Sequence, residues 1–268
     1  MDIHARWARA EHTGSLNLSN MNLTTLPPLP ENLRELRCSS NRLIALPVLP
    51  ASLLLLECAH NELTSLPPLP SFLHTLLCYE NRLGSLPVLP DSLLTLNCSG
   101  NEVTEITQLP PHLNWFACHD NRLTSVCWIP DSVQSLDLGS NQLKVLPNFP
   151  KNNLFVLDVS HNLFSDFPAF APSFGNSLLS VSAHNNPLNT RLSASVGAHG
   201  FRRGIPIYHA ALRKAARLRA AGRNLVRLKY SLGDAEISHD CLCLVGSYLT
   251  GERGDLDTQM AGLRRVFE

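Results

Sequence analysis

Apolar and polar positions along most of the chain repeat with a period of 20 residues. One unit reads Leu33-x-x-Leu36-x-Cys38-x-x-Asn41-x-Leu43-x-x-Leu46-Pro47-x-Leu49-Pro50. The Leu36 position recurs in nine units, occupied by Leu16, Leu36, Leu56, Leu76, Leu96, Phe116, Leu136, Leu157 and Val181. Chance does not keep such a register, so the repeat governs the fold.

The repeat predicts a leucine-rich-repeat solenoid. Around Leu36 and Cys38 the residues alternate between apolar and other types, which is the period of a β-strand with one buried face. Because one such strand cannot bury its apolar face alone, stacked copies should form a curved parallel β-sheet over a continuous core. The prolines of the Leu-Pro-x-Leu-Pro segment exclude a helix and predict an extended, polyproline-like convex side. Thr107 and Cys127 replace the first proline in two consecutive units.

An asparagine follows each predicted strand, and we expect its side-chain amide to bond backbone groups of the tight turn there. Met21 occupies this position in the first unit. The expected structural ladder consists of Asn41, Asn61, Asn81, Asn101, Asn121, Asn141 and Asn162.

Five cysteines share one inward position, at Cys38, Cys58, Cys78, Cys98 and Cys118. Leu138 and Val159 fill the same position in later units, which favours small apolar filler over chemistry. A linear stack does not give zinc its tetrahedral ligands, so we expect no metal and no other cofactor. Buried free thiols also indicate a reducing compartment.

The outward strand positions are not needed for the core and are the expected binding surface of a solenoid. They form three columns: Glu35, Leu55, Thr75, Thr95, Trp115, Ser135 and Val156; Asn17, Arg37, Glu57, Leu77, Asn97, Ala117, Asp137, Asp158 and Ser182; and Ser39, Ala59, Tyr79, Ser99, His119, Gly139 and Ser160. Exposed aromatic and apolar anchors carry interface energy, and charged neighbours select the partner. The alternative is a solvated face with incidental aromatic residues. The candidate partner-binding residues are Arg37, Glu57, Leu77, Tyr79, Asn97, Trp115, His119, Asp137 and Asp158. No catalytic set, phosphate loop or small-molecule site stands out among them.

Composition and charge divide the chain further. Hydrophobic residues make up 44% and charged residues 16%, which suits a packed core. No apolar stretch approaches a membrane span or a signal-peptide core, so we expect no integral membrane protein. The net charge is zero, but residues 1–166 carry 9 basic and 15 acidic side chains, whereas residues 167–233 carry 10 basic and none acidic. We expect a short N-terminal cap at 1–15, the repeats at 16–190, and a C-terminal cap and helical segment at 191–268.

The basic first half of that C-terminal segment predicts a helix that starts near Pro206. Arg213, Lys214 and Arg217 share its polar face. Such a face can contact an acidic protein, an anionic membrane or nucleic acid through residues 191–230, or it can simply be solvated. Farther on, Cys241 lies beside a base and a carboxylate and is a candidate nucleophile, although core packing is the simpler interpretation.

The Leu-Pro-x-Leu-Pro units with asparagine at a 20-residue period resemble the bacterial leucine-rich-repeat effectors of the YopM and IpaH types. The opening Leu16-Asn17-Leu18-Ser19-x-x-Asn22-Leu23-Thr24-Thr25-Leu26-Pro27 is similar to the first repeats of that group. The resemblance covers roughly residues 14–190.

This resemblance implies protein recognition through the concave face, by a bacterial effector-like protein that acts on host proteins. The IpaH branch adds a large ubiquitin-ligase domain whose cysteine is followed two residues later by Asp. About 80 residues follow the repeats here, and Asp240 precedes Cys241, so that domain is not recognisable. An E3 ubiquitin-ligase-type effector with a truncated or divergent catalytic region is the alternative. The implied location is the bacterial cytoplasm, with secretion into the host cytosol without a cleavable signal peptide as a further option.

Overall fold

A computed structural model describes residues 3–146, 154–166 and 180–188 of the chain. The chain divides into two units, Met1–Ile205 and Pro206–Glu268, and every described residue lies in the first. The boundary expected at residue 190 and the helical segment expected after it lie outside the described residues and stay predictions.

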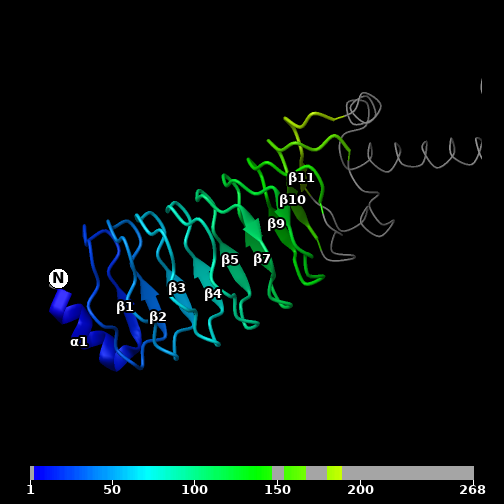
Figure 1. Cartoon of the computed structure of the whole chain (residues 1–268). Coiled ribbons are helices and arrows are strands. Elements are labelled where there is room, and N and C mark those ends of the chain that lie inside the picture. The colour runs from blue at the N-terminus through cyan, green and yellow to red at the C-terminus, as the bar shows by residue number, and fades with distance from the viewer. Residues whose placement is uncertain (1–2, 147–153, 167–179, 189–268) are drawn as a thin grey trace, which may run out of the picture. The chain divides into compact units, whose positions relative to one another are not determined.

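The repeats form a solenoid whose strands make one nine-stranded parallel sheet (Figure 1). Each strand pairs in register with the equivalent residues of the next repeat, so Leu36 lies beside Leu56 and Leu56 beside Leu76. The predicted leucine-rich-repeat fold is confirmed. In sheet order the strands are β1 (Ser15–Asn17), β2 (Glu35–Arg37), β3 (Leu55–Glu57), β4 (Thr75–Leu77), β5 (Thr95–Asn97), β7 (Trp115–Ala117), β9 (Ser135–Asp137), β10 (Val156–Asp158) and β11 (Ser180–Ser182).

The core is a set of columns that run along the stack, one for each apolar position of the repeat. Leu33, Leu36, Cys38 and Leu43 are all fully buried, and so are their counterparts in the following repeats up to the one that contains β10. In the last described repeat, Val181 and Leu188 are half-buried. The five thiols of the cysteine column therefore point inward, as the alternation predicts. Burial raises the pKa of the Cys38 thiol to about 12, with a further contribution from the charge of Glu57, so this thiol stays protonated at neutral pH.

Helix α1 (Ile3–Thr13) covers the open edge of the first repeat, in the segment expected only to be a short cap. Ala10 is fully buried and Trp7 is half-buried. Gly14 ends the helix: its φ of +68° is in the left-handed region, and its N–H donates to the Ala10 carbonyl at 2.8 Å. The apolar residues Ile3, Trp7 and Ala10, spaced as one helix face, are the signal that could have predicted this element.

The proline-rich side is extended in most repeats, but two repeats pair there. Strands β6 (Glu105–Ile106) and β8 (Ser125–Val126) form a separate two-stranded parallel sheet. The N–H of Cys127 donates to the Ile106 carbonyl at 3.1 Å. Proline lacks this donor, so the pairing occurs where Thr107 and Cys127 interrupt the proline column.

The ladder asparagines fasten each repeat to the one before it. The Asn81 side-chain oxygen accepts a hydrogen bond from the Leu63 N–H at 3.0 Å. Its amide nitrogen donates to the carbonyls of Cys58 at 3.0 Å, Cys78 at 3.1 Å and Tyr79 at 3.3 Å. One buried amide thus satisfies backbone groups on two successive repeats, which the tight coil removes from water.

The same asparagines stabilise a strained turn. The residue before each ladder position has a positive φ, for example 57° at Ser40, 52° at His60 and 54° at Glu80. This conformation costs a residue with a Cβ about 1–2 kcal/mol. Met21 occupies the ladder position of the first repeat, where no earlier repeat has to be fastened, and its N–H donates to the Asn41 side-chain oxygen at 3.1 Å.

Thiol titration tests the cysteine column. We expect the five column thiols to resist a disulfide reagent at pH 8 in the native protein, because they are buried, and all eight cysteines of the chain to react in denaturant. Cys127→Ser should leave the number of protected thiols unchanged. Reaction of four or more thiols in the native state would show that the column is accessible.

Asn81→Ala should lower the free energy of unfolding by about 2–4 kcal/mol, because it strands several buried backbone groups at once. Urea denaturation of the two proteins measures the difference. The matched control is Asn114→Ala at an exposed position, where the change should stay within about 0.5 kcal/mol. Similar losses for both variants would show that the ladder amide has no special role.

Candidate functional site

The outward side chains of the nine registered strands form one continuous surface, named here the exposed sheet face. The alternation of each strand turns its middle residue into the core and its first and last residues outward, as in β2, where Leu36 is buried and Glu35 and Arg37 are half-exposed. In-register pairing then places like positions side by side along the stack. Three segments of this face differ in chemistry.

The N-terminal segment is charged and internally paired. Arg37 binds the Glu35 carboxylate at 2.7 Å and approaches that of Glu57 at 3.4 Å. The hydroxyls of Ser15 and Ser39 donate to Glu35 and Glu57, at 3.2 and 3.3 Å. The side chains of Arg37, Glu35 and Glu57 are 28–44% exposed, so solvent screens these ion pairs. They fix the geometry of the side chains more than they stabilise the fold.

The central segment carries the apolar anchors. Leu55 and Leu77 are half-buried on adjacent strands, and Tyr79 packs its ring edge-to-face on His60 with centroids 5.1 Å apart. Trp115 on β7 keeps 36% of its surface exposed. Large rings held in place by neighbours lose little conformational entropy on binding, which makes them effective contact residues.

The C-terminal segment is acidic. Asp137 and Asp158 are register partners on adjacent strands. Asp120 lies in the turn after β7, and its carboxylate is 2.8 Å from His119 Nδ1. Gly139 makes room for the first two: a Cβ there would lie 3.3 Å from an Asp158 oxygen and 3.4 Å from an Asp137 oxygen. Backbone N–H groups of Gly139 and Ser160 donate to Asp137 and Asp158, at 3.1 and 2.9 Å.

The two kinds of carboxylate in this segment have opposite pKa shifts. Burial raises the pKa of Asp137 above its ordinary value, and the charges of Asp158 and Asp120 add to that effect, against opposing contributions from the Gly139 N–H and His119. The hydrogen bond from His119 lowers the pKa of Asp120. The segment thus holds like charges close together, which a cationic group from outside would relieve.

One column of the expected surface is mostly buried. Ser39, Ala59, Ser99, Gly139 and Ser160 are buried, so the expectation that this column is free for binding is wrong for them. The backbone turns at the end of each strand, and hydroxyls here serve the sheet: Ser39 accepts from the Ala59 N–H at 3.1 Å and Ser99 from the His119 N–H at 3.2 Å. Tyr79 and His119 are the half-exposed members.

The remaining predicted face residues lie on the exposed sheet face with part of their surface open. Arg37, Glu57, Leu77, Asn97, Asp137 and Asp158 occupy the middle column, half-exposed. Ala117 in that column is buried, so the middle column offers no accessible side chain on β7, the strand that carries Trp115. Whether these residues contact a partner stays a prediction.

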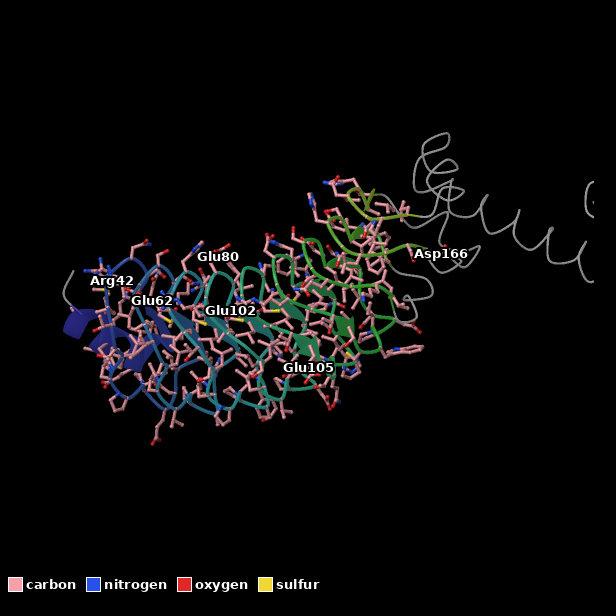
Figure 2. All side chains as sticks on the ribbon, turned by 45° about the horizontal axis from the view of Figure 1, so that its top comes forward. Arg42, Glu62, Glu80, Glu102, Glu105 and Asp166 are labelled. Carbon is pink, nitrogen blue, oxygen red and sulfur yellow. The ribbon has the colours of Figure 1, made fainter. Side chains whose placement is uncertain are left out.

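Charged side chains also alternate in sign along one edge of the stack, a feature that our sequence analysis missed. The residue after each ladder asparagine is in turn Arg42, Glu62, Arg82, Glu102 and Arg122. Figure 2 labels Arg42, Glu62 and Glu102 of this series. Arg82 pairs with Glu62, and Arg122 with Glu102, both at 3.1 Å. The 20-residue alternation was visible in the sequence, but only the stack shows that it puts opposite charges in contact.

Several predicted sites lie outside the described residues: the candidate nucleophile Cys241 and the basic residues Arg213, Lys214 and Arg217. Within the described ranges, no group of three or more His, Cys, Asp or Glu side chains could hold a metal ion. Likewise, none of the described helices is both long and apolar enough to span a membrane.

The fold has relatives among solved bacterial proteins. The structure of a Shigella effector leucine-rich-repeat domain is 29% identical, matches 73% of this chain and 80% of its own, and has a TM-score of 0.58. YopM from Yersinia enterocolitica WA-314 is 29% identical over 70% of this chain, with a TM-score of 0.45. YopM from Yersinia pestis is 20% identical over 69% of this chain and 88% of its own, with a TM-score of 0.37. This chain spans half the length of the Y. enterocolitica protein. No family model and no curated protein matches.

The acidic segment makes a pH-dependent prediction. Asp137→Asn should raise the free energy of unfolding at pH 7 by up to about 1 kcal/mol, since it removes a half-exposed charge beside Asp158 and keeps an acceptor for Gly139. Because the folded-state pKa of Asp137 is raised, its ionisation costs stability as the pH rises through that pKa. The gain should therefore vanish below pH 3, where both states are protonated.

Urea denaturation at pH 7 and pH 3 measures this difference. The control is Asp91→Asn, at an exposed position outside the face, which should change stability little at either pH. A loss of stability for Asp137→Asn at pH 7 would show that the carboxylate is held favourably rather than against repulsion.

Proposed function

The repeats are of the bacterial leucine-rich-repeat effector type, and we propose that this chain recognises another protein through its exposed sheet face. The observation that carries the proposal is the run of outward side chains on nine registered strands, with apolar anchors between charged segments. At about 4.8 Å between strands, nine strands present a surface roughly 38 Å long. A surface of that length matches one side of an ordinary protein–protein interface.

The chemistry of the face defines the partner. Leu77, Tyr79 and Trp115 provide apolar contacts near its centre, where water is most easily excluded. The carboxylates of Asp120, Asp137 and Asp158 favour lysine or arginine opposite the C-terminal segment. A folded domain or an extended segment with an apolar patch and basic flank on one side fits this pattern.

The finer proposal is that the partner belongs to a host cell and that the chain acts as an effector. Its support is the resemblance of the repeat subtype to bacterial effectors. The alternative of a ubiquitin-ligase-type effector is not part of this proposal, because its candidate nucleophile Cys241 lies outside the described residues.

The test is capture from host-cell lysate, followed by direct binding of each captured protein in purified form. Tyr79→Ala combined with Trp115→Ala should weaken binding at least about tenfold, because buried aromatic anchors cost 2 kcal/mol or more when truncated. The matched control truncates an aromatic and an aliphatic residue away from the face, Phe72→Ala combined with Val88→Ala; these are 64% and 90% exposed.

Binding that is lost with the first pair and kept with the second supports the proposal. Equal affinity of both double variants for every captured protein would reject the exposed sheet face as the binding surface. Thermal denaturation of both variants must match that of the wild type, so that a folding defect is not read as lost binding.

A further inference from the structure

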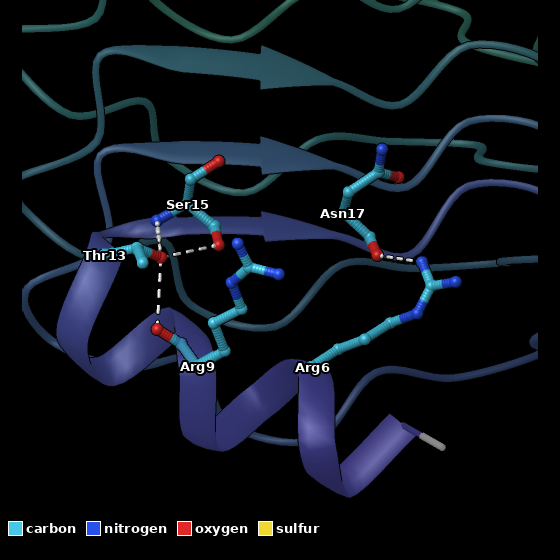
Figure 3. A pocket seen from close by; sticks show the side chains of 5 residues that line it. All are labelled: Arg6, Arg9, Thr13, Ser15 and Asn17. Atoms are coloured by element: carbon cyan, nitrogen blue, oxygen red, sulfur yellow. Dashed lines mark hydrogen bonds between the residues drawn. The ribbon is translucent and has the colours of Figure 1, made fainter. Parts of the chain in front are cut away.

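A cavity lies between helix α1 and strand β1, at the N-terminal end of the exposed sheet face (Figure 3). Its volume is about 410 Å³. The lining residues are Arg6, Arg9, Thr13, Ser15 and Asn17. This volume falls in the range of small-molecule sites, and none of the described residues that line it is acidic.

The local sequence builds the cavity. Arg6 and Arg9 are three residues apart on α1, so they lie on the same side of the helix. Ser15 and Asn17 are the outward residues of β1, the first strand of the sheet, so no further strand fills the space beside them. Figure 3 shows the Arg9 side chain extending from α1 toward β1.

Arg6 holds the cavity wall in place and has an unused donor. One of its terminal nitrogens donates to the Asn17 carbonyl at 2.6 Å, which ties α1 to the end of β1. Its Nε is buried, and it is the buried side-chain nitrogen or oxygen left without a hydrogen-bond partner in the described part of the chain. A buried charged donor without a partner is costly, so the guanidinium of Arg6 is left incompletely satisfied beside the cavity.

Arg9 is the exposed cation of the site. Among the described residues its guanidinium has no ion pair, unlike those of Arg37, Arg82 and Arg122. The hydroxyls are less available, because Thr13 bonds the Arg9 and Ser15 carbonyls and Ser15 donates to Glu35.

The acid that contacts the lining residue Ser15 is already ion-paired. Glu35 accepts from the Ser15 hydroxyl at 3.2 Å, but Arg37 binds the same carboxylate at 2.7 Å. The charged groups among the described lining residues are therefore the guanidinium groups of Arg6 and Arg9. Guanidinium groups are common protein partners of phosphate and carboxylate groups, which they bind in a fork-like geometry.

We propose that this cavity is an oxyanion-binding site that takes a phosphoryl or carboxylate group, with Arg9 as the main contact and Arg6 as the positioned second donor. The site is independent of protein recognition by the face, although it opens at the N-terminal end of that face. It gives the face opposite polarity at its two ends: basic at α1 and acidic at Asp137 and Asp158.

The experiment is a titration of the full chain followed by NMR of backbone amides and arginine Nε–H groups. Three probes are compared at constant ionic strength set with sodium chloride: inorganic phosphate, phenyl phosphate and acetate. We expect saturable shifts at Thr13, Ser15 and Asn17 and at the Arg9 side chain. Comparing inorganic phosphate with phenyl phosphate shows whether the site prefers the free ion or a phosphate ester. Acetate shows whether a carboxylate also binds.

Arg9→Gln should weaken binding of the saturating probe by about tenfold, as expected when one charged hydrogen-bonding group is removed. The matched control Arg42→Gln removes the same charge from an exposed position outside the cavity and should change the affinity by less than about twofold. Arg6 is not used for this test, because its loss would also release α1.

Shifts that rise linearly for all three probes without saturation would overturn the proposal. So would equal weakening by Arg9→Gln and Arg42→Gln, which would reduce the effect to general charge. Because no protein partner enters this measurement, its outcome does not depend on what the exposed sheet face binds.

Discussion

The structure depends on one buried amide per repeat. A three-residue strand and an extended return segment bury too little apolar surface to be stable alone, and the tight coil between them removes backbone groups from water. The side chain of Asn81 resolves both problems, since it bonds carbonyls of its own repeat and of the preceding one. Each amide therefore acts as a fixed link that sets the register of the next strand.

The in-register pairing of the strands aligns the outward side chains of all repeats into one surface. Once every Leu36-type residue lies beside its counterpart, the outward positions must also align, and their chemistry varies freely because the core does not use them. The N-terminal segment of the exposed sheet face carries paired charges around Arg37, and its centre carries Tyr79 and Trp115. Its C-terminal segment carries Asp137 and Asp158. The same regularity explains the ion pairs of Arg82 with Glu62 and of Arg122 with Glu102, which join equivalent positions of neighbouring repeats.

Sequence reasoning predicted the parts of the fold that follow from periodicity. The buried cysteine column and the inward leucines follow from alternation within a strand, which is a local property. It failed where tertiary contact decides. The N–H of Cys127 finds the Ile106 carbonyl only because two proline-free segments are stacked, and Ser99 is buried only because the turn after its strand closes over it.

The sequence alone determined the stacked parallel architecture, because a 20-residue period with leucine, cysteine and asparagine at fixed positions has no other way to bury its apolar residues. Only the tertiary structure decided which outward residues remain accessible and which charges meet. It alone also brings Arg6 and Arg9 of α1 beside Ser15 and Asn17 of β1 around one cavity. The physical reason is that burial and charge pairing depend on distances between neighbouring elements, and the repeat pattern does not specify how a helix packs against the open edge of the first repeat.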